Sequence, residues 1–169
     1  MELSSVPTDA ELAALAGHIA TGLQQHKLML ASAESCTGGW IAKTLTDLSG
    51  SSAWFEAGVV SYSNEAKISL LGVKRETLER TGAVSEATVL EMVSGALTRL
   101  HAGVAVAVTG IAGPTGGTPD KPVGTVWVGW RRLGSEAHAE LFRFPGDREA
   151  VRRHTVAAAL KGVLDLLTD

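Results

Sequence analysis

The sequence at positions 28–39 reads LMLASAESCTGG, a short apolar run followed by polar and small residues that end in two glycines. Ile41, Leu45 and Leu48 then recur at helical spacing up to Gly50. A short apolar run is typical of a buried strand, and the small residues provide a turn before the helix. The stretch therefore predicts a strand over 28–33, a turn over 34–39 and a helix, which is the basic unit of an α/β protein.

The same alternation of strands and helices continues on both sides of this stretch. Thr8 and Glu11 form the pattern of a capping box at the start of a first helix, which ends near His26. Runs rich in apolar and β-branched residues predict further strands over 55–62, 103–109, 123–131 and 137–144. Helical periodicity predicts four more helices. Asn64 and Ser85 are the expected caps of two of them, and the other two start at 74 and near Asp147. The last two strands are separated by a tight turn at 133–135, so we expect an antiparallel hairpin. Together these elements predict a three-layer α/β/α sandwich with a mixed, mostly parallel sheet of about five strands.

The composition restricts the class of protein. The chain has 169 residues, of which 45% are hydrophobic and 20% charged, so we expect one compact domain over 1–169. No apolar run is long enough to span a membrane and no secretory signal is visible, which predicts a cytoplasmic protein without a membrane partner. The net charge of -3 provides no positive field for nucleic acid. A single cysteine and five scattered histidines predict no disulfide and no metal site.

The turn at 34–39 carries the first candidate for chemistry. Ser35 follows a predicted strand and precedes a helix, where open α/β sheets bind ligands and where free backbone N–H groups stabilise an anion. Ser35 is therefore a candidate nucleophile, with Cys36 as its competitor. Cys36, Thr37 and Gly38 are also candidate binding residues. The alternative interpretation is that Ser35 or Thr37 only caps the helix, with the glycines forming the turn.

A serine nucleophile needs a base, and no histidine stands in a comparable turn. Lys67 falls in the first turn of a predicted helix, where the positive end of the helix dipole disfavours an ammonium ion. A neutral amine at this place can accept the serine proton, and Tyr62 can orient that amine or transfer a proton. The alternative for Lys67 is an exposed surface lysine, and the alternative for Tyr62 is an ordinary aromatic residue of a strand.

A second glycine cluster, TGIAGPTGG at 109–117, follows the predicted strand over 103–109. Such a loop offers unpaired amides to a phosphate or an oxyanion, or else it uses its glycines only for turns. It lacks the lysine of a nucleotide-binding P-loop. The candidate binding residues of this loop are Thr109, Gly110, Ile111, Ala112 and Gly113.

Arginines at the start of the last helix are candidate phosphate ligands. Arg148 and Arg152 are four positions apart and so share one helical face. The alternative is a solvated face with ion pairs to Asp147 and Glu149, and it applies best to Arg153.

Five blocks of sequence in order closely resemble the C-terminal domain of the CinA family: AESCTGG at 33–39, GVVSYSNEAK at 58–67, GAVSE at 82–86, TGIAGPTGG at 109–117 and KPVGTV at 121–126. The resemblance implies a nicotinamide-nucleotide amidohydrolase that converts nicotinamide mononucleotide and water to nicotinate mononucleotide and ammonia, without a metal or organic cofactor. It maps the family's nucleophilic serine onto Ser35, its lysine onto Lys67 and its aromatic position onto Tyr62. It also implies a homo-oligomer, while the net charge of -3 predicts no nucleic-acid partner. Trp40 and Glu56-Ala57 depart from residues common in the family and affect substrate fit rather than chemistry.

Two other functions fit the same residues. The first is a domain that binds a pyridine nucleotide as a sensor without turning it over. The second is a protein-interaction role in DNA uptake or repair, which predicts a basic or apolar docking patch that the sequence does not display.

Overall fold

Five strands form one sheet in the computed structural model, which describes residues 5–168; the remaining ends of the expected domain lie outside the described part. The strand order is β2-β1-β3-β4-β5, with the bounds β1 Leu30–Glu34, β2 Phe55–Val60, β3 Val104–Gly110, β4 Thr125–Arg132 and β5 His138–Arg143. β1 pairs in parallel with both β2 and β3, whereas β4 runs antiparallel to β3 and β5. All strands except β4 therefore point the same way, which confirms the mixed, mostly parallel sheet and its terminal hairpin.

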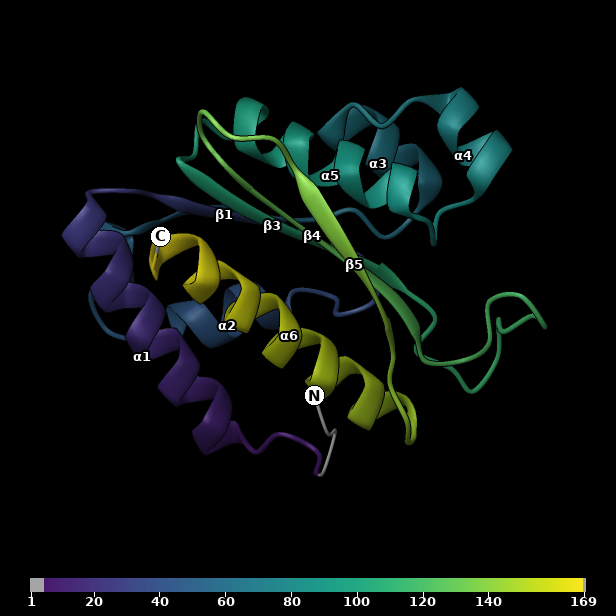
Figure 1. The fold of residues 1–169 in the computed structure, drawn as a ribbon, viewed down its shortest axis with the longest axis horizontal. Helices are drawn as coiled ribbons and strands as arrows, with labels where there is room; N and C mark the ends of the chain where they lie inside the picture. Colours follow the sequence, from purple (N-terminus) through teal and green to yellow (C-terminus); the bar gives the residue numbers. More distant parts are fainter. Residues whose placement is uncertain (1–4, 169) are drawn as a thin grey trace.

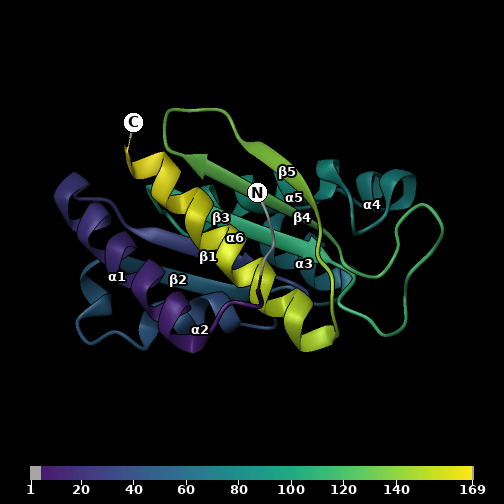
Figure 2. The ribbon, with the colours of Figure 1, turned by 60° about the horizontal axis from the view of Figure 1, so that its bottom comes forward.

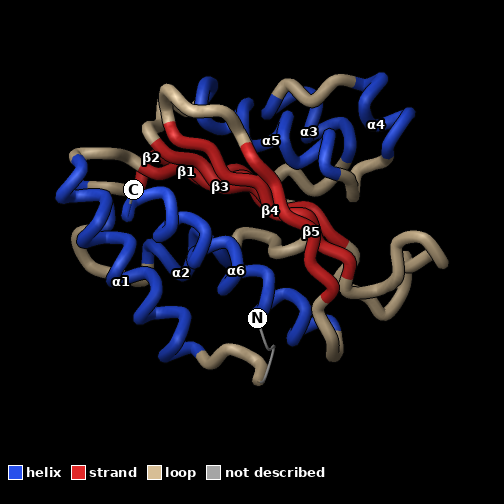
Figure 3. Tube along the Cα trace, in the orientation of Figure 1, coloured by secondary structure: helices blue, strands red, loops and turns tan. Residues whose placement is uncertain are grey.

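Helices cover both faces of this sheet (Figure 1). One face carries α1 (Asp9–His26), α2 (Trp40–Thr46) and α6 (Arg148–Thr168), and the other carries α3 (Asn64–Leu71), α4 (Arg75–Thr81) and α5 (Glu86–Arg99). The two helical layers and the sheet between them are distinct in Figure 3. In the turned view of Figure 2, α1 and α6 run side by side across their face, where they contact each other. The three-layer sandwich is confirmed.

Side chains of β3 alternate between the two cores, as the two-residue period of a strand requires. Val104, Val106 and Val108 pack with α1, α2 and α6, whereas Ala105 and Ala107 pack with α5 on the opposite face. All five are fully buried. A strand covered on both faces reads as a continuous apolar run, which is why 103–109 was recognisable in the sequence.

Two of the predicted helix caps are confirmed and one is wrong. Thr8 forms the capping box with Glu11, and Ser85 accepts a hydrogen bond from the Thr88 amide. Asn64 is instead the first residue of α3, and Ser63 caps that helix by accepting from the Ala66 amide. The cap is one residue earlier because Ser63 has the extended backbone that lets its hydroxyl reach the third helical amide.

The described part of the chain has no helix that is both long and apolar enough to span a membrane.

Candidate active site

The turn between β1 and α2, residues 35–39, is called here the Ser35 turn. Its first residue is 8% exposed, and the turn closes through a hydrogen bond of 3.0 Å from the Gly38 amide to the Ser35 carbonyl. Gly38 and Gly39 have φ angles of +62° and +102°, in the left-handed region that side-chain-bearing residues avoid. The glycine pair thus lets the chain reverse within a few residues and presents Ser35 at the carboxyl end of β1.

Lys67 reaches Ser35 from a different element. Its Nζ lies 3.0 Å from Ser35 Oγ and donates to the carbonyl oxygens of Ser61, at 2.9 Å, and Tyr62, at 3.1 Å. The lysine side chain belongs to α3 and is only 1% exposed. The alternative of a surface lysine is therefore wrong. With Ser63 as the cap, the Lys67 amide already donates to the Ser63 carbonyl, so Lys67 lies deeper in the helix than the sequence suggested.

Burial changes the pKa of the candidate base Lys67 and of the competing nucleophile Cys36. Loss of solvent lowers the pKa of the Lys67 ammonium, because a charged amine is poorly stabilised away from water. The same loss of solvent raises the pKa of the Cys36 thiol to about 12, and the nearby Glu34 carboxylate adds to this effect. Cys36 is thus a protonated, buried thiol, which does not favour it as the competing nucleophile.

Glu34, the last residue of β1, organises the Ser35 turn from inside. Its carboxylate accepts hydrogen bonds from Thr37 Oγ1 at 2.6 Å, the Ile41 amide at 2.8 Å and the Ala42 amide at 3.0 Å. The N-cap residue of α2 is Gly39, which makes no side-chain capping bond. Neither Ser35 nor Thr37 therefore caps α2, because the buried Glu34 carboxylate takes that role. This role of Glu34 was not predicted from the sequence.

A cleft of about 270 Å³ opens in front of Ser35 and Lys67. It includes most of the predicted site residues: Ser35, Cys36, Tyr62, Lys67, Thr109, Gly110, Ile111, Ala112, Gly113 and Arg148. Thr115 and Gly116 of the predicted glycine-rich loop also line it, and so do Asn64, Ala83 and Val84, which the sequence did not indicate as site residues. The loop after β3 extends beyond the end of the sheet in Figures 1 and 2 and supplies one wall of the cleft.

Arg148 closes one side of this cleft. Its Nη1 donates to the Gly113 carbonyl at 2.8 Å, and its Nη2 donates to the Tyr62 hydroxyl at 3.3 Å. The Tyr62 side chain is 59% exposed, whereas its carbonyl oxygen is bound to Lys67. The two ends of Tyr62 thus have different partners: its backbone orients the amine, and its hydroxyl lies beside the Arg148 guanidinium.

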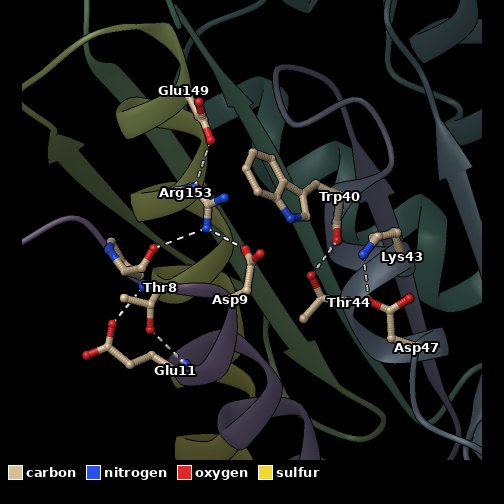
Figure 4. A network of polar contacts seen from close by, with 10 residues as sticks. Thr8, Asp9, Glu11, Trp40, Lys43, Thr44, Asp47, Glu149 and Arg153 are labelled. Carbon is tan, nitrogen blue, oxygen red and sulfur yellow. Dashed lines mark hydrogen bonds and ion pairs between the residues drawn. The ribbon is translucent and has the colours of Figure 1, made fainter.

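Three predicted binding residues, Thr37, Gly38 and Arg152, are not among the residues that line this cleft. They instead line a separate surface hollow together with Trp40. Arg152 donates to carbonyl oxygens of the Ser35 turn. Arg153 forms ion pairs with Asp9 and Glu149, which Figure 4 shows beside Trp40. The ion pair expected between Arg153 and Glu149 is confirmed, whereas the side chain is only 18% exposed and its second acidic partner is Asp9 instead of Asp147.

Several backbone amides near Ser35 are already paired. The Ser35 amide donates to the Val108 carbonyl at 3.2 Å, and the Ile111 amide donates to the Thr125 carbonyl at 2.9 Å. α2 begins at Trp40, directly after the turn predicted over 34–39. Stabilisation of an oxyanion by the first amides of α2 is thus disfavoured, since Glu34 accepts from the Ile41 and Ala42 amides.

No three histidine, cysteine, aspartate or glutamate side chains gather in a metal-binding arrangement within residues 5–168.

Comparison with known proteins places the chain among close relatives. Residues 12–167 match the family model of the CinA C-terminal domain. Nicotinamide-nucleotide amidohydrolase PncC of Escherichia coli strain K12 is 51% identical over 154 residues, which are 91% of this chain and 93% of that protein. The Pseudomonas putida protein of the same name is 52% identical over 155 residues, 92% of this chain and 96% of the relative. The crystal structure of competence/damage inducible protein CihA from Agrobacterium tumefaciens superposes with a TM-score of 0.91 at 44% identity, covering 99% of this chain and 100% of the other.

Proposed function

Because the chain belongs to the CinA C-terminal domain family, we propose that it is an amidohydrolase that converts nicotinamide mononucleotide and water to nicotinate mononucleotide and ammonia. The observation that supports this function best is the 3.0 Å contact between the buried Lys67 amine and Ser35 Oγ, two residues that line the cleft. Relatives that carry the name nicotinamide-nucleotide amidohydrolase supply the substrate class.

The hydrogen bonds of Lys67 are suited to a neutral amine. A neutral amine has two N–H groups and one lone pair, and the carbonyl oxygens of Ser61 and Tyr62 can accept the two N–H groups. The lone pair then faces Ser35 Oγ, the third neighbour of Nζ, and can accept its proton. The lowered pKa of Lys67 favours this protonation state.

In the proposed first step, Lys67 accepts the Ser35 hydroxyl proton while Oγ bonds to the carboxamide carbon of the substrate. The resulting tetrahedral oxyanion collapses, the carbon–nitrogen bond breaks, and Lys67 returns the proton to the leaving ammonia. Water then attacks the acyl-enzyme, Lys67 accepts its proton and passes it to Ser35 Oγ, and nicotinate mononucleotide leaves. Lys67 thus acts first as base and then as acid in each half of the reaction, and every proton is accounted for.

We assign stabilisation of the oxyanion to two backbone amides, those of Cys36 and Gly110. The Cys36 amide directly follows the nucleophile, which is the position used in other serine hydrolases. The Ile111 amide donates to the Thr125 carbonyl of β4, so strand alternation directs the preceding Gly110 amide to the opposite side, where Ser35 follows the end of β1. Each such donor is typically worth about 3 to 4 kcal/mol in the transition state.

The substrate phosphate is proposed to bind at Arg148 together with amides of the loop at 112–117. A guanidinium beside a glycine-rich loop provides charge and several N–H donors for a phosphate. Arg148 fits this role better than Arg152, because only Arg148 lines the cleft that contains Ser35.

The test is product identification with purified protein and nicotinamide mononucleotide in the presence of a chelator. We expect equimolar ammonia and nicotinate mononucleotide by coupled assay and chromatography, and neither product with Ser35→Ala. Binding of the nucleotide without products from the wild-type protein would contradict the enzyme and support the sensor function instead.

A further inference from the structure

Arg152 belongs to α6, but its guanidinium lies against the Ser35 turn. Its Nε donates to the Cys36 carbonyl at 3.1 Å, and its Nη2 donates to the Thr37 carbonyl at 3.0 Å. A Cβ added at Gly38 would stand 3.4 Å from Arg152 Nη2, so the guanidinium packs directly on the turn. Two consecutive peptide groups of the turn, Cys36–Thr37 and Thr37–Gly38, are thus held by one side chain of a distant helix.

These two hydrogen bonds fix the orientation of the turn. A trans peptide is planar, so its N–H points opposite to its carbonyl. The Thr37 carbonyl is held by Arg152, and the N–H of the same peptide, that of Gly38, donates to the Ser35 carbonyl at 3.0 Å. The peptide group that closes the turn onto Ser35 is therefore held by Arg152 on the outer side of the turn. On the inner side, the Glu34 carboxylate accepts a hydrogen bond from Thr37.

The guanidinium is itself held in place. It lies over the Trp40 ring, 5.4 Å from the ring centroid, at the start of α2. Flanking α6 residues Val151 and Val156 are fully buried in the core. Hydrogen bonds from a permanently charged guanidinium to carbonyls are stronger than neutral ones, and the planar group loses little freedom in making two of them.

We propose that Arg152 is a positioning residue that holds the Ser35 turn in the conformation that places Ser35 Oγ beside Lys67 Nζ. The inference rests on the proposed role of Ser35 as nucleophile. It differs from a phosphate-binding role, because Arg152 lies outside the cleft and directs two of its donors to the protein backbone.

Steady-state kinetics with two substrates separates these roles. Nicotinamide mononucleotide and nicotinamide riboside differ only in the phosphate, so a residue that positions Ser35 affects kcat for both. A misplaced reacting group typically costs roughly 10²-fold in rate, and we expect a loss of this order in kcat for Arg152→Ala with either substrate, with little change in KM. Arg152→Lys keeps the charge but not the planar pair of donors, so it should restore only part of the rate.

Arg153→Ala is the matched control. Arg153 is the next residue of α6 and lies over the same Trp40 ring, at 4.9 Å from its centroid, but its ion pairs are with Asp9 and Glu149 (Figure 4). We expect it to keep the wild-type kcat. A rise in KM for the mononucleotide alone in Arg152→Ala, or an unchanged kcat, would overturn the proposal.

Labelling of Ser35 by a fluorophosphonate, followed by mass spectrometry of the Ser35 peptide, tests the positioning role without any nucleotide. We expect labelling to be slower by a similar factor in Arg152→Ala and unchanged in Arg153→Ala; equal rates in wild type and Arg152→Ala would overturn the proposal. Thermal unfolding shows which variants are folded. If Arg152→Ala does not fold, the labelling rate of Arg152→Lys is compared with that of the wild type instead. If the wild-type protein is labelled at Ser35 but releases no ammonia from the nucleotide, the proposed substrate fails while the labelling rates still decide the role of Arg152.

Discussion

Lys67 Nζ lies 3.0 Å from Ser35 Oγ, although the two residues are 32 positions apart and belong to α3 and to the turn before α2. The contact forms because β1 and β2 are neighbours and their carboxyl ends meet at one edge of the sheet. The Ser61 amide donates to the Glu34 carbonyl at 2.9 Å, so the chain leaving β2 stays aligned with the chain leaving β1. In the proposed mechanism this pair carries every proton transfer.

The pH dependence of kcat/KM should follow the protonation of Lys67. The neutral amine is the active form, so activity should be lost as pH falls through the Lys67 pKa. Burial lowers that pKa, so this loss lies below the pKa of about 10.4 of an exposed lysine. Cys36, with a pKa of about 12, stays protonated throughout and should not contribute a second transition. Rates measured from acid to alkaline pH check this; a kcat/KM that does not rise with pH would contradict a lysine base.

Arg148→Ala should weaken binding of the phosphate. Hydrogen bonds to charged groups contribute about 1.5 to 3 kcal/mol, so KM for nicotinamide mononucleotide should rise roughly 10- to 100-fold, with kcat nearly unchanged. KM for nicotinamide riboside, which lacks the phosphate, should change little.

Arg131→Ala is the control for Arg148→Ala. Arg131 is on β4 and donates to Ser135 in the turn at the far end of the sheet, so both substrates should retain their wild-type KM. An equal rise in KM for both substrates in Arg148→Ala would place that residue at the ring or sugar rather than at the phosphate.

Glu34→Ala should destabilise the fold. The carboxylate accepts hydrogen bonds from two buried or partly buried amides at the start of α2. An amide left without a partner lowers the free energy of unfolding by about 1 to 3 kcal/mol. For a chain of this size the thermal midpoint should fall by roughly 2 to 4 °C per kcal/mol. Glu56→Ala, at an exposed position of β2, removes the same side chain and should leave the midpoint nearly unchanged. Equal midpoints for the two variants would show that Glu34 does not stabilise α2.

Gly95 and Gly17 provide a pair of glycine-to-alanine substitutions with opposite expected effects. A Cβ at Gly95 of α5 would overlap the backbone carbonyl of Leu71, the last residue of α3, so Gly95→Ala should lower stability by about 1 to 3 kcal/mol. A Cβ at Gly17 of α1 meets no atom within 4 Å, so Gly17→Ala should raise stability by up to about 1 kcal/mol through helix propensity. Chemical denaturation measures both, and a stable Gly95→Ala protein would show that α3 and α5 can separate.

The sequence was sufficient for the order of the elements and for most of the cleft. Apolar runs, glycine turns and caps are local signals, and they placed Ser35, Lys67 and the loop after β3 at strand ends. The cap of α3 was placed at Asn64 instead of Ser63, because both residues are good caps and only the backbone conformation distinguishes them.

Contacts between distant segments were beyond local patterning. Nothing near Arg152 in the sequence shows that it reaches Cys36 and Thr37, which are more than a hundred positions away. Ala83 and Val84 reach the cleft because Thr109 Oγ1 donates to the Ala83 carbonyl at 2.9 Å and holds that loop at the end of β3. A glutamate directly before a glycine-rich turn was the available signal for Glu34, since an acceptor at that place can satisfy the first helical amides.

The most direct test of the serine–lysine account compares ammonia release from nicotinamide mononucleotide by wild type, Ser35→Ala, Lys67→Ala and Cys36→Ala, with nucleotide binding measured in parallel by calorimetry. The account predicts turnover by wild type and Cys36→Ala, and bound nucleotide without turnover in the other two. Turnover retained in Ser35→Ala or Lys67→Ala, or lost in a folded Cys36→Ala protein, would contradict it.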